Sequence, residues 1–250
     1  MPLLPPNSRS RVVGDLACQR DSYLRTIDSE VISCVEWSPP KTNGSKKSSK
    51  NGASANEPEK FYLIEFQDSV LFPEGMSSKH VTLLPPLTLL GGGQPTDHGT
   101  LLPLSSPSAE PIKINSIQRQ GLQCVYHSPQ PLDPGTRVRQ DVDFKRRWDH
   151  MQQHTGQHLL SAIMDKYENL ESVGWGMGAE GEINYIDLPR KPTDEEMQTI
   201  QEECNEAIRN NLKISVETPD DAKSDSLPED YDKEKGIVRI IKIGDIDANP

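Results

Sequence analysis

The sequence changes its hydrophobic periodicity near residue 145, and this change constrains the fold more than any other feature. Before it, stretches rich in β-branched residues predict strands at residues 23–37, 61–75 and 112–127. After it, apolar residues recur every three to four positions and predict helices at residues 146–167 and 193–212. Short strands are expected between and after these helices. The order predicts an α+β fold, with a β-rich unit followed by an α+β unit.

The domain boundaries follow from the same periodicity. We expect residues 1–17 to form a disordered tail, residues 18–145 a β-rich N-terminal domain, and residues 146–250 an α+β domain. Two segments interrupt the first domain. Residues 38–60 are polar and of low complexity, which is typical of a linker or a long hairpin loop. Residues 76–91 are apolar, are broken by prolines, and match neither neighbour.

The second predicted helix carries a start signal and an apolar stripe. Thr193 and Glu196 have the spacing of a capping box. Cys204 falls on the apolar stripe, so we expect a core thiol there and not a metal ligand.

Composition excludes several classes of protein. No apolar run reaches the roughly 20 residues of a membrane span, and the first residues contain prolines where a signal peptide needs an apolar core. The four cysteines are scattered and form no Cys-x-x-Cys motif. This spacing argues for a reducing compartment and against a disulfide framework. We therefore expect a cytoplasmic protein without a membrane segment.

The net charge of −11 disfavours a nucleic-acid partner, but the charge is uneven along the chain. Residues 112–150 carry seven Lys or Arg against four Asp or Glu, whereas residues 187–250 carry nine against seventeen. The basic stretch contains Arg137, Arg139, Lys145, Arg146 and Arg147. Two interpretations carry equal weight: a solvated strand and helix start, or a patch that contacts phosphates.

Three of the six histidines, His150, His154 and His158, follow one another at intervals of four on the first predicted helix. On a helical wheel with Trp148 at the centre of the buried face, they lie at about 200°, 240° and 280°. His150 should then face outward, His154 should flank the core, and His158 should border it. An adjacent i,i+4 pair can share one ion, and the pair His154 and His158 is the better placed.

A His-x-x-x-His spacing is a weak metal signal, because such pairs are often only polar surface. The metalloprotease motif needs a glutamate after the first histidine, and Thr155 stands there. A zinc site also needs at least a third protein ligand, which the neighbouring sequence does not supply.

The stretches RRWDHMQQ, HTGQHLLSA, FPEG and GGQPTDHGT together resemble the freestanding alanyl-tRNA editing proteins of the AlaX type, which are similar to the editing domain of alanyl-tRNA synthetase. The resemblance implies a small β-barrel-like N-terminal domain and an α+β editing domain. It implies a zinc-dependent hydrolase that removes serine, in trans, from alanine-accepting tRNA.

The resemblance also implies roles for particular residues. His154 and His158 would be zinc ligands and act through the metal. Six residues would form the glycine-rich loop near the acceptor end or line the substrate pocket: Gly92, Gly93, Gln94, Asp97, Thr155 and Gln157. A pocket that bonds the serine hydroxyl would reject alanine, because its own polar groups would stay unpaired.

The sequence departs from the family pattern in two ways. Residues 76–91 separate the FPEG motif from the glycine-rich motif; they are either a tolerated surface loop or a retained intron, with the intron slightly favoured. The family also places a Cys and a His after a strand like the one that ends at Pro250, so two expected zinc ligands are missing.

Two alternatives to a deacylase stay open. One is a non-catalytic tRNA-binding protein with an incomplete metal site. The other is a fragment of an alanyl-tRNA synthetase, although the N-terminal region is too short and too rich in strands to hold an ATP-binding catalytic core.

Overall fold

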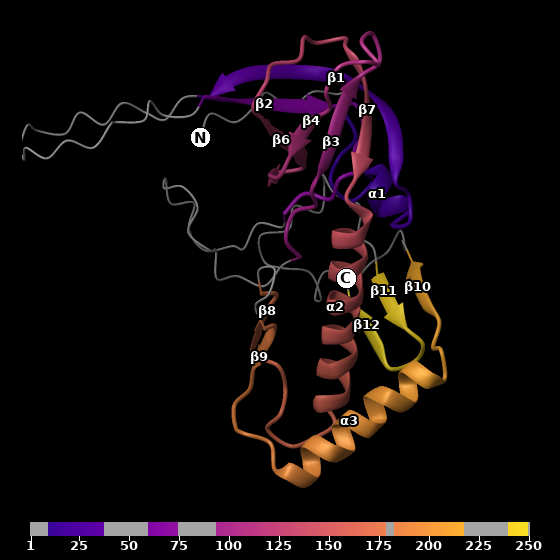
Figure 1. The fold of residues 1–250 in the computed structure, drawn as a ribbon. Helices are drawn as coiled ribbons and strands as arrows, with labels where there is room; N and C mark the ends of the chain where they lie inside the picture. Colours follow the sequence, from indigo (N-terminus) through magenta and orange to yellow (C-terminus); the bar gives the residue numbers. More distant parts are fainter. Residues whose placement is uncertain (1–9, 38–59, 75–93, 179–182, 218–239, 250) are drawn as a thin grey trace, which may run out of the picture.

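The computed structural model describes residues 10–37, 60–74, 94–178, 183–217 and 240–249. In chain order the elements are α1 (Ala17–Arg20), β1 (Thr26–Trp37), β2 (Phe61–Phe66), β3 (Gly99–Pro103), β4 (Ile112–Ile114), β5 (Ile117–Gln120), β6 (Gln123–Ser128), β7 (Arg137–Val142), α2 (Phe144–Met164), β8 (Gly174–Gly176), β9 (Tyr185–Asp187), α3 (Asp194–Arg209), β10 (Ile214–Glu217), β11 (Ile240–Ile243) and β12 (Asp247–Asn249). Strands β1 to β7 gather at one end of α2, and the later elements surround the rest of that helix (Figure 1).

The first seven strands form one sheet in the order β4-β3-β7-β1-β2-β6-β5. Every neighbouring pair is antiparallel. The two edge strands, β4 and β5, are separated in sequence only by Asn115 and Ser116. Because so short a connection joins opposite edges, the sheet must curl until the edges meet. The result is a nearly closed, barrel-like sheet.

A bulge in β1 produces much of this curvature. Thr26–Glu30 of β1 pair with β7, and the pairing with β2 begins at Val31. Val31 and Ser33 face consecutive residues of β2, so Ile32 is the extra residue of a β-bulge. A bulge bends its strand and increases the local twist. It lets β1 leave one partner and join another.

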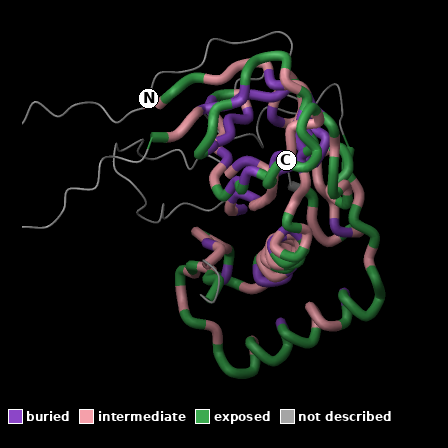
Figure 2. The backbone as a smooth tube through the Cα atoms, turned by 45° about the horizontal axis from the view of Figure 1, so that its top comes forward, coloured by how far each residue is buried: buried purple, intermediate pink, exposed green. Residues whose placement is uncertain are grey.

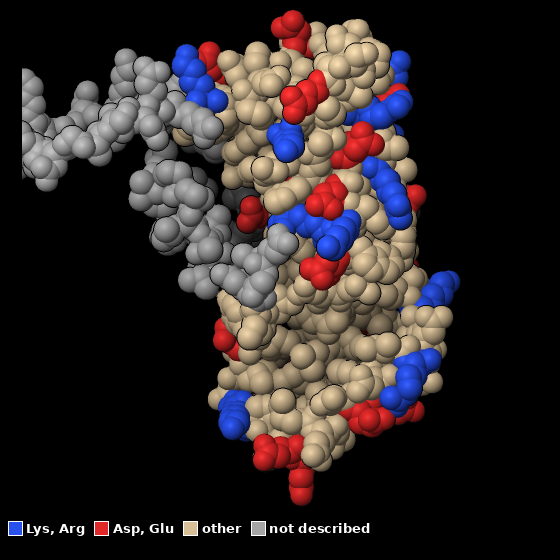
Figure 3. All heavy atoms as spheres, viewed as in Figure 1, with Lys and Arg blue, Asp and Glu red and all other residues tan. Residues whose placement is uncertain are grey.

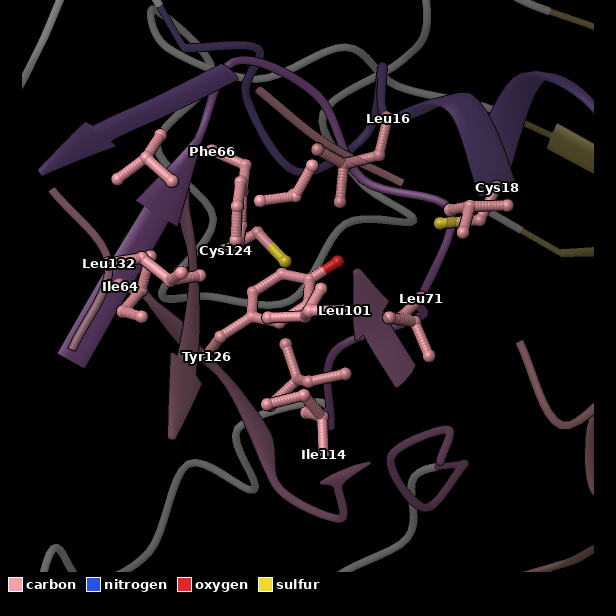
Figure 4. Close-up of a cluster of buried hydrophobic side chains, with 14 of the residues drawn as sticks. Leu16, Cys18, Ile64, Phe66, Leu71, Leu101, Ile114, Cys124, Tyr126 and Leu132 are labelled. Carbon is pink, nitrogen blue, oxygen red and sulfur yellow. The ribbon is translucent and has the colours of Figure 1, made fainter. Parts of the chain in front are cut away.

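The barrel encloses a core of aliphatic and aromatic side chains (Figure 4). Tyr126 lies at its centre, with its ring edge-on to Phe66 at 4.8 Å between centroids. The Tyr126 hydroxyl is hydrogen-bonded to Ser69 and to Gln140, and the Gln140 amide oxygen also accepts from the backbone N–H of Val70. A buried hydroxyl needs such partners, because an unpaired one would destabilise the core.

Residues 10–17 do not belong to a disordered tail, which corrects the boundary expected from the sequence. Leu16 is 1% exposed and Val13 is 9% exposed. The backbone N–H groups of Arg11 and Val13 donate to the carbonyls of Gln67 and Leu122. The apolar pair therefore belongs to the barrel core. Residues 1–9 lie outside the described residues.

Only Asp143 separates the end of β7 from the start of helix α2. The helix packs through two different faces along its length. Asp143 caps it by accepting from the backbone N–H of Arg146 at 3.2 Å. His150 is 6% exposed and Trp148 is 40% exposed, which reverses the expected outward and buried positions. Because α2 leaves directly from β7, the barrel covers the His150 side of its first turns.

The C-terminal part of α2 packs against the later elements. Leu159, Ile163 and Met164 are buried with Ile200 of α3 and Ile243 of β11. Three strands, β10, β11 and β12, form a small antiparallel sheet beside them. Figure 2 shows α3 running along the edge of the molecule with much of its surface exposed.

The predicted start of α3 is confirmed. The Thr193 hydroxyl accepts from the N–H of Glu196 at 3.2 Å, and the Glu196 carboxylate accepts from the N–H of Thr193 at 2.8 Å. Arg190 adds two bonds to the same carboxylate. These donors lower the pKa of Glu196 to about 2, Arg190 having the largest effect.

Several other expectations from the sequence can be compared with the structure. The arrangement fits the predicted α+β class, while the division into domains at residues 145 and 146 stays a prediction. The four cysteines, all of them in the described residues, form no disulfide bond, and Cys204 packs at the margin of the second core. In the described part of the chain, no helix is long and apolar enough to cross a membrane. Residues 38–59 and 76–91 lie outside the described residues.

Candidate functional site

Helix α2 brings His154 and His158 together on one face. Their imidazole centroids lie 5.0 Å apart and the rings are inclined by 26°. This is the contact that an i,i+4 spacing allows on an α-helix. The pair was predicted from the sequence, and the structure brings the two rings side by side.

Trp175 of β8 forms an aromatic wall beside the pair. Its ring centroid lies 5.3 Å from that of His154 and 6.5 Å from that of His158. Strand β8 is held by β9, whose Asp187 pairs with Gly174. Trp175 was not predicted as a site residue, because a single tryptophan far along the chain carries no local signal.

Two oxygen atoms from distant segments approach the Nδ1 atoms of the two histidines. Gln94 Oε1 lies 3.1 Å from His154 Nδ1. Asp247 Oδ2 lies 3.6 Å from His158 Nδ1, a contact longer than a hydrogen bond. Gln94 was predicted to belong to the site as a substrate-binding residue, and the structure places it against a histidine. Asp247 was not predicted, since only the folding of β12 brings it near α2.

Both imidazoles are held in their neutral form. Burial, with a smaller contribution from the neighbouring His158, lowers the pKa of His154 to about 4. Burial also lowers the pKa of His158, while Asp247 opposes the shift. A neutral imidazole carries one N–H and one lone pair. Each ring can therefore offer a lone pair to a cation or a hydrogen-bond donor at neutral pH.

The histidine pair fits part of a zinc site. A neutral imidazole is a good zinc ligand, but a zinc site needs four protein ligands, or three protein ligands and a water molecule. Among the residues that the structure describes, no three His, Cys, Asp or Glu side chains cluster to hold a metal. The described residues thus supply two donors, and a complete site would need others.

Asp97, predicted as a substrate-binding residue, lies in the interior and is bonded to α2. It is 0% exposed, and Arg147 is 2% exposed. Arg147 Nε donates to Asp97 Oδ2 at 2.7 Å, and its Nη2 donates to the same oxygen and to Val70 O. The backbone N–H of Phe72 is a further donor to Asp97 Oδ2, at 2.6 Å.

Gly99, which follows Asp97 in the same motif, is required at its position for a steric reason. A Cβ atom on Gly99 would lie 2.3 Å from the backbone oxygen of Asp141 and 2.3 Å from Leu71. Only glycine lets β3 approach β7 this closely while Asp97 reaches Arg147. Gly92 and Gly93, predicted to act with Gln94, lie outside the described residues.

The five predicted tRNA-binding cations occupy different environments. Arg137 and Lys145 are exposed. Arg139 is exposed and pairs with Asp28 at 2.9 Å, and Arg146 donates to the carbonyl of Thr96 at 3.2 Å. Arg147 is buried against Asp97, so it does not reach a surface phosphate. Figure 3 shows basic and acidic side chains interleaved on the visible face, without a patch of one sign.

Thr155 and Gln157, predicted to line the pocket, are both partly buried on α2. Gln157 Nε2 donates to the Ser161 hydroxyl at 2.9 Å, and Ser172 donates to Ser161 at 2.7 Å. Gln157 Oε1 is buried and has no hydrogen-bond partner among the described residues. It is an acceptor available to a hydroxyl group.

Fold and site together define an α+β protein with a curled antiparallel sheet and a neutral histidine pair on a long helix. No protein-family model matches the chain. The chain is 37% identical over 260 residues to a Saccharomyces cerevisiae protein provisionally named alanyl-tRNA editing protein alaX, covering 95% of this chain and 50% of that protein.

Vertebrate proteins show the same similarity. The alanyl-tRNA editing protein Aarsd1-A of Xenopus laevis is 34% identical, over 93% of this chain and 49% of its own length. The Bos taurus protein Aarsd1 is 32% identical, over 93% of this chain and 46% of its own. The chain spans about half the length of the curated relatives it matches. The chain is thus related to the AlaX-type alanyl-tRNA editing proteins, as its motifs predicted.

Proposed function

We propose that this protein is an aminoacyl-tRNA editing hydrolase, which deacylates seryl-tRNA charged on an alanine-accepting tRNA and acts in trans. One observation carries the proposal: the chain matches alanyl-tRNA editing proteins over 93–95% of its length. Helix α2 supports it, because it presents a neutral pair of imidazoles, His154 and His158, beside the Gln94 amide. Location in the cytoplasm belongs to the same proposal.

His154 and His158 would hold a zinc ion with further ligands from outside the described residues. The bound metal would polarise the ester carbonyl or acidify a water molecule. An aminoacyl ester is already labile, so the protein has mainly to position substrate and water. Trp175 covers the pair on one side, which helps to exclude bulk water from the imidazoles.

Thr155 and Gln157 would line the pocket for the amino acid, with Gly92 and Gly93 near the acceptor end. Gln157 Oε1 supports this assignment, because it is a buried acceptor without a partner among the described residues. A serine hydroxyl could satisfy such an acceptor, whereas the alanine methyl group could not. That difference favours the seryl ester.

The tRNA contact would depend on the exposed cations along β7 and at the start of α2. Arg137 and Lys145 are the best placed of the predicted residues, since both are exposed. Arg139 and Arg146 could contribute after rearranging their present contacts with Asp28 and Thr96. The contribution of Arg147 would be indirect, through its ion pair with Asp97.

A second candidate is a tRNA-binding protein without catalysis. It is favoured by one observation: among the residues described, no three His, Cys, Asp or Glu side chains cluster to hold a metal. Zinc content distinguishes the two candidates. A protein that edits should retain the metal after dialysis, and a protein that only binds tRNA should not need it.

The direct test measures deacylation of seryl-tRNA and alanyl-tRNA, together with zinc content after dialysis. We expect hydrolysis of the seryl ester, and loss of both hydrolysis and zinc in His154→Ala and His158→Ala. Gln152→Ala is the matched control, because Gln152 lies on the same helix and is exposed. Equal rates for all of these proteins would refute the proposal.

A further inference from the structure

We propose that Gln94 is a positioning residue: its side-chain oxygen accepts the Nδ1 proton of His154 and so leaves Nε2 as the nitrogen with the lone pair. The role of this bond in deacylation rests on the proposed function. The bond itself and the proton position that it selects do not, because both belong to the protein without substrate or metal.

The contact between the two side chains is direct and shielded. Gln94 Oε1 and His154 Nδ1 are 3.1 Å apart, and Gln94 is 8% exposed. An amide oxygen can only accept a hydrogen bond. The imidazole nitrogen that faces it must therefore carry the proton. The other ring nitrogen, Nε2, is left with the lone pair.

The choice of nitrogen matters for what His154 can bind, because a neutral imidazole carries one N–H and one lone pair. In a neutral histidine, the partner of one nitrogen decides which nitrogen is free. Histidines that bind metals commonly donate their second N–H to an oxygen in this way.

Three contacts hold the segment that carries Gln94 along α2. Besides Gln94 and His154, Thr96 O accepts from Arg146 Nε at 3.2 Å, and Asp97 is paired with Arg147. The attachment points Arg147 and His154 are seven residues apart, or about 10 Å along the helix axis. Because Asp97 is also bonded to the barrel backbone at Phe72, the Gln94 segment is fixed to both the barrel and α2.

The environment of His158 is consistent with this role. Its Nδ1 faces Asp247 Oδ2 at 3.6 Å, so an oxygen approaches the same nitrogen in both rings. If both protons lie on Nδ1, both lone pairs lie on Nε2. A single ligand can then bind both rings through equivalent atoms. The longer Asp247 contact is not needed for the inference, which concerns Gln94 alone.

The test is the position of the proton on His154, read from the nitrogen chemical shifts of the metal-free, 250-residue protein in solution. We expect the Nδ1–H form in the unmodified protein and in Gln94→Glu, which keeps an acceptor oxygen. In Gln94→Leu, which removes the acceptor at similar volume, we expect loss of this preference. A thermal melt verifies that each variant is folded.

The outcome that overturns the proposal is an Nε2–H form in the unmodified protein, or a proton position that is the same in Gln94→Leu. Gln152→Leu is the matched control, because Gln152 is exposed on the same helix and should leave the proton in place. A fall in seryl-tRNA hydrolysis in Gln94→Leu that Gln94→Glu restores would be the expected functional effect.

Zinc titration gives a second readout that does not involve catalysis. Loss of a group that orients a metal-binding histidine weakens metal affinity by about 10- to 100-fold, and we expect this loss in Gln94→Leu but not in Gln152→Leu. Equal affinities would overturn the role of Gln94. If the proton position is as expected but seryl-tRNA is not hydrolysed, the proposed function fails while the positioning role stands.

Discussion

Individual side chains show how burial assigns a role that charge alone does not. Arg147 belongs to a run of three basic residues, yet it is 2% exposed and bonded to Asp97, Val70 and Ser22. Lys145, two positions earlier, is exposed. The same type of charge thus stabilises the junction of barrel and helix at one position and faces solvent at the other.

We expect Arg147→Met to destabilise the protein by about 3–5 kcal/mol, because the Asp97 carboxylate would stay buried without its partner. Lys145→Met should change the free energy of unfolding by less than about 0.5 kcal/mol. Urea denaturation of the three proteins at neutral pH measures both effects. Similar midpoints for the two variants would show that the buried pair is not important for stability.

A partly buried histidine, His127, predicts acid sensitivity. Burial lowers the pKa of His127 to about 4, and its ring stacks on Phe61 at 5.0 Å. Because the folded pKa lies below the unfolded value of 6.5, the unfolded state binds more protons between these two values. The stability from the neutral ring is present above pH 6.5 and is lost as the pH falls toward 4.

The loss should amount to roughly 3 kcal/mol for the full shift. His127→Gln removes the titration, so its free energy of unfolding should depend less on pH between 6.5 and 4. Comparing the two proteins by urea denaturation across this range isolates the histidine, because all other titrating groups are shared. Parallel curves would show that His127 is not held neutral in the fold.

Among the helices and strands, the start of α3 makes a contribution to stability that can be tested. The Thr193 hydroxyl and the Glu196 carboxylate satisfy each other's backbone N–H groups. We expect Thr193→Ala to lower the free energy of unfolding by about 1 kcal/mol. Thr199→Ala in the same helix should be neutral or slightly stabilising, since alanine favours helix. Denaturant unfolding that ranks the two variants the other way would contradict the cap.

Along β7 and at the start of α2, we expect tRNA binding to depend on Arg137 and Lys145. The double variant Arg137→Gln, Lys145→Gln should weaken binding and reduce the salt dependence, because each phosphate contact releases a counterion. Lys191→Gln, Lys213→Gln changes the charge equally at exposed positions near α3. If both double variants bind alike across a salt series, the surface that carries Arg137 and Lys145 is not the interface.

For the molecule as a whole, residues 76–91 lengthen the connection between the barrel and α2. Glu74 is paired with the barrel at Gln118, and Gln94 is bonded to α2, so the chain between them links two fixed points. Deleting residues 76–91 leaves three residues between Glu74 and Gln94. The shorter link should stabilise the protein by roughly 1–2 kcal/mol through reduced loop-closure entropy. A lower melting temperature in the deletion variant would indicate that the segment contributes to the fold.

Local features were predicted from the sequence because their causes lie within a few residues. The spacing of His154 and His158 determines a shared helix face. The capping box at Thr193 determines the start of α3. The change of periodicity near residue 145 separates strands from helices. Each depends on backbone geometry that repeats over four residues or fewer.

Tertiary structure alone decided which groups meet. The helical wheel drawn from the sequence could not place His150 or Trp148 correctly, because α2 packs against the barrel with one face and against α3 with another. Gln94 reaches His154 over 60 positions of sequence, and Asp97 reaches Arg147 over 50. Such contacts depend on how β3, β7 and α2 pack together, and spacing along the chain carries no information about that packing.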